Sequence, residues 1–154
     1  MNGTNNYQDR NSVANLAEFL FEEYCNEKGY FFRRLGFDEK KDPIPNFFAI
    51  NPMVRNLPDY YIYREAGGHN LSFLVMVKGT ANLKQSEYRL IPHFVEWYDS
   101  KGCSLIYAFC FKGEKKPLLI YPEKLIQLYT ESQDKTWHDG IIYRTLNLNG
   151  NHTR

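Results

Sequence analysis

The segment covering residues 71–78 constrains the possible folds more than any other part of the chain. In an extended strand its side chains alternate, so that one face carries Ser72, Leu74, Met76 and Lys78, and the other carries Leu71, Phe73, Val75 and Val77. Both faces are therefore mostly apolar as far as the final lysine. A strand of this kind must be covered on both sides, which predicts a central position in a sheet with helices on both faces.

Apolar periodicity divides the rest of the chain into helices and strands. Spacing of three and four residues predicts helices over residues 12–28, 83–98 and 123–129. Runs of apolar and aromatic residues predict strands over residues 30–35, 59–63, 71–78, 103–111, 117–121 and 141–148. We expect Asn11 or Ser12 to cap the first helix, Gly29 to end it, and Pro92 to kink the second helix or begin its second half.

The order of these elements is αβββαβ followed by a βαβ extension. It predicts an α/β (α+β) fold in which a mixed central sheet is flanked by helices on opposite faces. The length of 154 residues indicates one domain, which we place over residues 12–148 with flexible tails at 1–11 and 149–154. Residues 36–57 include several prolines and form a predicted loop too long for a plain turn, and such loops usually have a function.

Composition and charge exclude several classes of protein. Hydrophobic residues make up 43% of the chain, enough for a packed core, and a net charge of +1 argues against a strongly basic, nonspecific nucleic-acid binder. The sequence has neither an apolar run of membrane-spanning length nor a signal-peptide core. The spacing of Cys25, Cys103 and Cys110 favours reduced thiols over a disulfide framework or a zinc site. These features predict a cytoplasmic protein without a membrane partner.

One pair of residues is typical of a catalytic site rather than of a packed core. Lys78 ends the apolar strand, where its ammonium group must reach solvent or lie opposite a carboxylate. Asp59, which follows Pro58 at the start of the preceding strand, is the natural partner. A carboxylate and an ammonium group at adjacent strand ends can hold a divalent metal ion and a water molecule against a phosphodiester.

The order of elements, together with Pro58-Asp59 and Lys78, resembles the PD-(D/E)xK nuclease superfamily of restriction enzymes and Holliday-junction resolvases. The resemblance covers roughly residues 14–111. It implies a restriction endonuclease-like fold and hydrolysis of DNA by a water molecule activated by Mg²⁺ or Mn²⁺. It makes Asp59 a metal ligand and Lys78 the catalytic lysine. Glu18, eleven residues before Gly29-Tyr30, matches the acidic residue of the family's first helix, and Gln85 matches a glutamine of the RecB-like branch.

The sequence departs from the family at the second acidic position, two residues before the lysine, where Met76 stands. Methionine is a poor ligand for Mg²⁺, which prefers oxygen donors. In some branches the acid lies on the next helix, and Glu87 matches that arrangement as a metal ligand. Without such a replacement, the chain would be a catalytically inactive nuclease-fold protein that serves as a DNA-binding or protein-interaction module.

Further residues are candidates for contacts with DNA, the expected partner. They are Tyr61 on the second strand, Lys84 and Arg89 at the second helix, and Lys112, Lys115 and Lys116 in a predicted hairpin. Phe47 and Phe48 in the long loop are further candidates for base stacking. The alternative is that the aromatic residues fill the core and the lysines only face solvent. A homodimer is compatible with the sequence, as is an aromatic-rich interaction protein without a nucleic-acid role.

Overall fold

The computed structural model describes residues 7–35 and 56–149. Within these ranges the helices are α1 (Tyr7–Lys28), α3 (Gln85–Asp99) and α4 (Pro122–Thr130). The strands are β1 (Phe31–Arg34), β2 (Tyr60–Ala66), β3 (His69–Lys78), β4 (Asn82–Lys84), β5 (Ser104–Phe109), β6 (Leu118–Ile120), β7 (Asp134–Thr136) and β8 (Ile142–Thr145).

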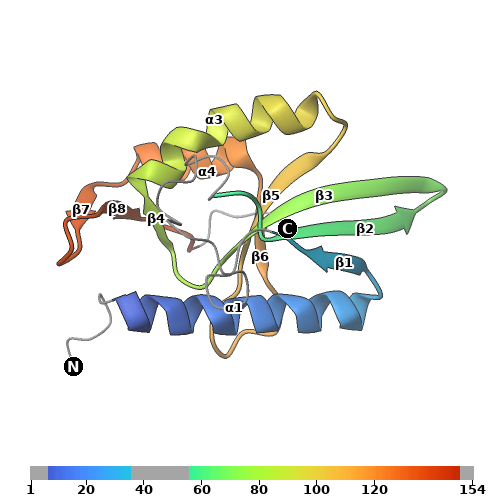
Figure 1. Ribbon diagram of the computed structural model, residues 1–154, viewed down its shortest axis with the longest axis horizontal. Helices are drawn as coiled ribbons and strands as arrows, with labels where there is room; N and C mark the ends of the chain where they lie inside the picture. Colours follow the sequence, from blue (N-terminus) through green and yellow to red (C-terminus); the bar gives the residue numbers. More distant parts are fainter. Residues whose placement is uncertain (1–6, 36–55, 150–154) are drawn as a thin grey trace, which may run out of the picture.

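A mixed sheet in the order β1-β2-β3-β5-β6 forms the centre of the described part of the chain. The apolar strand β3 lies in its middle, as predicted. β3 and β5 run parallel, whereas the other neighbouring pairs are antiparallel. Helix α1 covers one face, and α3 and α4 lie on the other side (Figure 1). The predicted α/β class, with helices on opposite faces of a mixed sheet, is confirmed.

A smaller sheet joins β4, β8 and β7 in that order and lies beside the start of α3 (Figure 1). Residues 137–140 close the β7–β8 hairpin, where the Gly140 N–H donates to the Trp137 carbonyl oxygen at 3.0 Å. Leu83 of β4 and Leu146, which follows β8, are buried in the apolar cluster beneath α3. This sheet therefore extends the core on the α3 side.

Helix α1 packs on the sheet through residues spaced four apart. Ala17, Phe21 and Cys25 are almost inaccessible, and they contact the cluster that contains Tyr60 and Val75. α1 contacts β3 and β1 of the sheet, and its fully buried residues form a narrow face of one residue in four. Val13 and Leu16, which belong to the apolar spacing that predicts this helix, are more than a third exposed, so that spacing is wider than the buried face.

Gly79, directly after β3, permits this close approach of α1. A Cβ atom at this position would lie 2.6 Å from Val13 Cγ1 and 2.7 Å from the Val13 carbonyl oxygen. The second of these atoms belongs to the helix backbone, so it can move only if the helix moves. The glycine is required by the contact between α1 and the end of β3.

Two helix starts differ from the sequence expectation. α1 begins at Tyr7, so residues 7–11 belong to the helix and not to the expected tail, and neither Asn11 nor Ser12 caps it. A helix can continue beyond the residues that pack on the core, and apolar periodicity detects only the packed part. α3 begins at Gln85 because Leu83 belongs to β4, where it pairs with Arg144 of β8. Pro92 lies inside α3, which continues to Asp99.

The strands also differ from expectation in length and number. β2 and β3 extend toward each other until only Gly67 and Gly68 remain between them, with φ of 59° and 81°, as a two-residue hairpin requires. The short strand β7 escapes sequence analysis because its residues are polar and exposed. Most of the expected loop, residues 36–55, lies outside the described residues, and Phe47 and Phe48 with it.

Two further expectations concern the membrane and the cysteines. Among the described helices, none is long and apolar enough to cross a bilayer. Cys25, Cys103 and Cys110 are free thiols, as predicted. Burial raises the pKa of the Cys25 and Cys110 thiols to about 12, so both are inert packing groups.

Replacing Gly79 tests the contact between α1 and β3. We expect Gly79→Ala to lower the free energy of unfolding by about 1–3 kcal/mol, because the new methyl group overlaps the helix backbone. Urea denaturation followed by circular dichroism measures the change. Asn15→Ala, on the exposed side of α1, is the control and should change stability by less than about 0.5 kcal/mol. A Gly79→Ala variant as stable as wild type would contradict the close packing.

Candidate functional site

The start of β2 and the end of β3 meet at one edge of the sheet and fix the position of Asp59. The Asp59 N–H donates to the Val75 carbonyl oxygen at 2.9 Å. In return, the Val77 N–H donates to Asp59 Oδ2 at 2.7 Å. The carboxyl group of Asp59 is therefore held beside the last residues of β3 by a hydrogen bond to the backbone.

Lys78 forms an ion pair with Glu87 of α3. Its Nζ lies 2.9 Å from each carboxylate oxygen of Glu87, and the two side chains are 17% and 23% exposed. Glu87 Oε1 also accepts the N–H of Lys84 at 3.2 Å, which satisfies a backbone donor at the start of α3. The sequence expectation that Asp59 is the direct partner of Lys78 is therefore wrong. The longer side chain of Glu87 reaches the ammonium group from α3, while Val77 holds the Asp59 carboxyl group.

Glu18 of α1 points toward the same edge of the sheet. Its carboxylate accepts a hydrogen bond from Arg34 of β1, and its side chain is 18% exposed. Arg34 also donates to the Tyr60 hydroxyl at 3.2 Å, and this hydroxyl donates to Glu22, one helical turn after Glu18. Glu23, which the sequence did not separate from Glu18, is exposed. The Arg34 network therefore anchors the acidic side of α1 to β1 and β2.

These groups line one cavity of about 180 Å³. Glu18 comes from α1, Asp59 from the start of β2, Lys78 from the end of β3 and Glu87 from the first turn of α3. Met76 also faces this cavity. The structure thus brings together the carboxylates that the sequence left far apart, with a methionine among them.

The two carboxyl groups nearest Lys78 have opposite pKa shifts. Burial raises the pKa of Asp59 from 3.8 to about 7, Glu18 and Glu87 raise it further, and the Val77 N–H and Lys78 oppose them. Burial also acts on Glu87, but the positive charges of Lys78 and Lys84 hold its pKa below the ordinary value. Perturbed carboxyl groups in one cavity are typical of functional sites.

The carboxyl oxygens of Glu18, Asp59 and Glu87 are the kind of donor that Mg²⁺ and Mn²⁺ prefer. Within residues 7–35 and 56–149, however, no group of three or more His, Cys, Asp or Glu side chains is arranged to hold a metal ion. Glu18 is paired with Arg34, and both oxygens of Glu87 contact Lys78. The described carboxylates therefore match a hard cation in donor type, but they are not arranged around a common metal position.

The other predicted site residues lie at different distances from this cavity. Gln85 begins α3 but is absent from the residues that line the cavity. Tyr61 forms a hydrogen bond with Ser72 at 3.0 Å within the sheet. Lys84 lines a neighbouring cavity, and Arg89 is exposed on α3. Lys112, Lys115 and Lys116 are exposed between β5 and β6, in the predicted hairpin.

Sequence reasoning missed two residues at the site. Tyr107 of β5 lies opposite Met76 in the sheet register and lines the cavity, where burial raises the pKa of its hydroxyl. The sequence placed it in the core of a buried strand, and no pattern distinguishes it from its apolar neighbours. Arg34 was assigned to a strand only. Its pairing with Glu18 depends on the long-range contact between α1 and β1, which the sequence does not reveal.

Comparisons with known proteins do not assign the chain to a family. No protein-family model matches the sequence, and a search of curated proteins finds no significant relative.

The raised pKa of Asp59 predicts an unusual dependence of stability on pH. Between pH 3.8 and about 7 the native carboxyl group keeps a proton that the unfolded chain has released, so the stability contributed by Asp59 falls as pH rises through this window. We expect Asp59→Asn to be more stable relative to wild type at pH 8 than at pH 5. Urea denaturation in EDTA at both values measures this difference. An equal difference at the two values would contradict the shift.

The Lys78–Glu87 ion pair predicts a measurable coupling. In a double-mutant cycle with Lys78→Met and Glu87→Gln, we expect a coupling free energy of about 1–2 kcal/mol, because both partners are largely shielded from water. The ion pair between Arg144 and Asp134 is the matched comparison. Asp134 is 52% exposed, so that pair should couple by less than about 1 kcal/mol. Chemical denaturation of the single and double variants gives both values, and equal couplings would contradict the account.

Proposed function

We propose that the chain is a metal-dependent nuclease of the PD-(D/E)xK type that hydrolyses phosphodiester bonds in DNA. One observation carries the proposal. Glu18, Asp59, Lys78 and Glu87 come from four separate elements and line the same cavity at the sheet edge. Charged side chains that merely face solvent at strand and helix ends need not line one cavity. A phosphodiesterase site, by contrast, needs carboxylates and a cation together.

Lys78 supplies the positive charge of the proposed site. Its ammonium group stabilises the negative charge that develops on the phosphate during attack by water. The two contacts with Glu87 at 2.9 Å hold the lysine side chain at the cavity wall. Loss of one such charge stabiliser typically lowers a rate constant by about 10²–10³.

Glu87 supplies the carboxylate that the nuclease family has at the position occupied here by Met76. Both residues line the cavity that contains Asp59, so a carboxylate from α3 reaches the region that a carboxylate on β3 would occupy. Asp59 and Glu87 would hold Mg²⁺ or Mn²⁺, with Glu18 as the auxiliary carboxylate. When bound, the cation would lower the pKa of a water molecule and help to neutralise the phosphate.

A second candidate is a catalytically inactive nuclease-fold module that binds DNA or protein. The specific observation in its favour is that Glu87 uses both oxygens to contact Lys78, while Met76 presents no oxygen donor. This candidate predicts binding without cleavage, and no dependence of binding on a divalent metal ion.

A cleavage assay tests the first candidate. We expect purified protein to cut single-stranded or duplex DNA in Mg²⁺ or Mn²⁺ but not in EDTA. Asp59→Asn and Lys78→Met should each lower the rate at least about 100-fold, because they remove a ligand and a charge stabiliser. Asp99→Asn, at the exposed last residue of α3, and Lys101→Gln, in the exposed turn that follows, are controls that should cut as wild type does. Cleavage that survives both site changes would overturn the assignment.

A rescue experiment tests the role of Glu87. Glu87→Gln should abolish cleavage, and the double variant Met76→Glu/Glu87→Gln should regain it in part, because the carboxylate returns to the cavity from β3. Restored cleavage would show that a carboxylate at position 76 can replace the carboxylate of Glu87. Full activity of Glu87→Gln alone would exclude Glu87 as the replacement. If no variant cuts but all bind DNA, the inactive module is the correct reading.

A further inference from the structure

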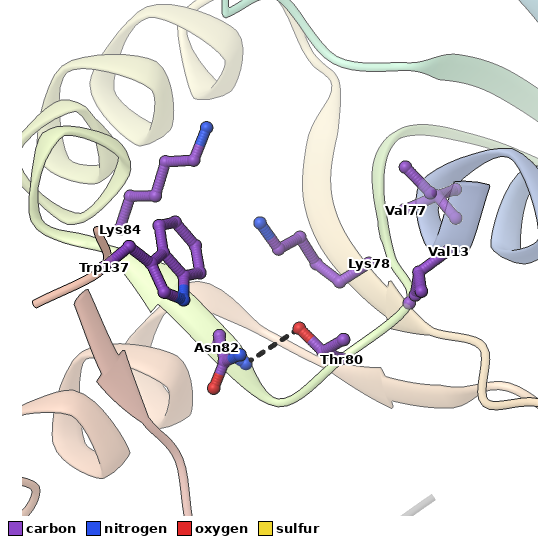
Figure 2. A pocket seen from close by; sticks show the side chains of 9 residues that line it. Val13, Val77, Lys78, Thr80, Asn82, Lys84 and Trp137 are labelled. Carbon is purple, nitrogen blue, oxygen red and sulfur yellow. Dashed lines mark hydrogen bonds between the residues drawn. The ribbon is translucent and has the colours of Figure 1, made fainter. Parts of the chain in front are cut away.

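A second cavity of about 180 Å³ adjoins the carboxylate cavity on the other side of Lys78. Ala14, Val77 and Lys78 line both, so a ligand that lies across Lys78 touches the two cavities at once. Figure 2 shows this second cavity, with Lys78 on one side and Trp137 on the other. A space more than ten times the volume that one water molecule requires accommodates a group of several heavy atoms.

The two cavities differ sharply in charge. The first is lined by the carboxyl groups of Glu18, Asp59 and Glu87. Among the described residues, the second is lined by Lys78, which it shares with the first, and by Lys84, and by no acidic residue. Anionic ligand groups are therefore favoured in the second cavity and metal cations in the first, and Lys78 stands at the boundary between them.

The rest of the wall offers fixed polar groups and an aromatic ring. Thr80 Oγ1 accepts the N–H of Asn82 at 3.2 Å, and the Asn82 amide oxygen accepts the Thr145 hydroxyl at 2.7 Å, which hold the β3–β4 connection in place. Trp137 stacks on Tyr143 with ring centroids 4.3 Å apart. The indole is thus a rigid apolar wall, contributed by the β7–β8 hairpin (Figure 2).

We infer that this second cavity binds one unpaired nucleotide of the DNA strand, next to the phosphodiester that lies at Lys78. Lys84 contacts the phosphate backbone, and Trp137 packs against the sugar or base. Lysine side chains beside an aromatic wall are the combination by which proteins hold single strands. A paired base lies inside its duplex, whereas an unpaired base is free to enter the cavity between α1 and the small sheet. This inference rests on the proposed nuclease function.

The intrinsic fluorescence of Trp137 reports binding in the test of this inference. The chain has two tryptophans, and Trp97 is 49% exposed on α3, so a Trp97→Phe background leaves only the indole of the cavity. A short single-stranded DNA is titrated into this protein in EDTA, and indole emission is recorded. We expect a saturable change in emission. Lys84→Gln should weaken binding at least about fivefold. It should also lower the slope of the logarithm of the binding constant against the logarithm of the salt concentration by about one.

Matched controls make the result specific. Lys101→Gln removes an equivalent charge from an exposed turn and should leave binding unchanged. Circular dichroism verifies that each variant is folded. Inorganic phosphate at the same phosphate concentration should give no comparable change in emission, and a duplex of the same sequence should bind more weakly.

Several outcomes would overturn the inference. If a fluorescent label on the DNA reports binding while indole emission stays constant, the strand binds elsewhere. If phosphate alone reproduces the change, the cavity is a small-anion site, and if duplex binds as tightly, the nucleotide is not unpaired. Cleavage in Mg²⁺ without the indole response would leave the nuclease proposal intact and remove this cavity from it. The indole response without cleavage would support the cavity and contradict the nuclease.

Discussion

The register between β2 and β3 determines where Asp59 and Lys78 of the candidate site lie relative to each other. The hairpin at Gly67 and Gly68 sets this register, and it brings Asp59 beside Val77 at the opposite end of the two strands. Because β5 runs parallel to β3, its carboxyl end reaches the same edge and adds Tyr107 opposite Met76. Helix α3 then starts close to this edge and contributes Glu87. A slip of one residue would turn Lys78 to the α1 face and separate it from Glu87.

Charge pairing at this edge balances the cost of burying ionisable groups. Lys78 compensates one carboxylate directly, through Glu87, and Arg34 compensates Glu18. Burial of the Asp59 carboxyl group, together with the nearby Glu18 and Glu87, raises its pKa to about 7, although the Val77 N–H and Lys78 act in the opposite direction. The carboxylate cavity thus contains three carboxyl groups beside Lys78, whereas the neighbouring cavity beyond Lys78 presents lysines to an anion. In the proposed function, this arrangement would place a phosphate of the DNA beside the metal ion.

The sequence predicted the architecture better than the contacts of the site. The apolar pattern of β3 required cover on both faces, and that requirement alone predicts a central strand with helices on opposite sides. Pro58-Asp59 and Lys78 were correctly placed near each other. The partner of Lys78 was not, because the choice between Asp59 and Glu87 depends on side-chain length and on the approach of α3. The short strand β7 is missed because its residues are polar and exposed, and β4 is missed because Leu83 fits the apolar spacing of the helix that follows it.

Direct binding of a metal ion tests the central claim, that Asp59 and Glu87 form a cation site, more directly than any assay of cleavage. Isothermal titration calorimetry with Mn²⁺, without nucleic acid, separates ligand binding from catalysis. The account predicts one Mn²⁺ bound per chain in wild type and in the exposed control Asp99→Asn, and strongly weakened binding in Asp59→Asn and in Glu87→Gln. Absence of binding to wild type, or equal binding by Asp59→Asn, would contradict it.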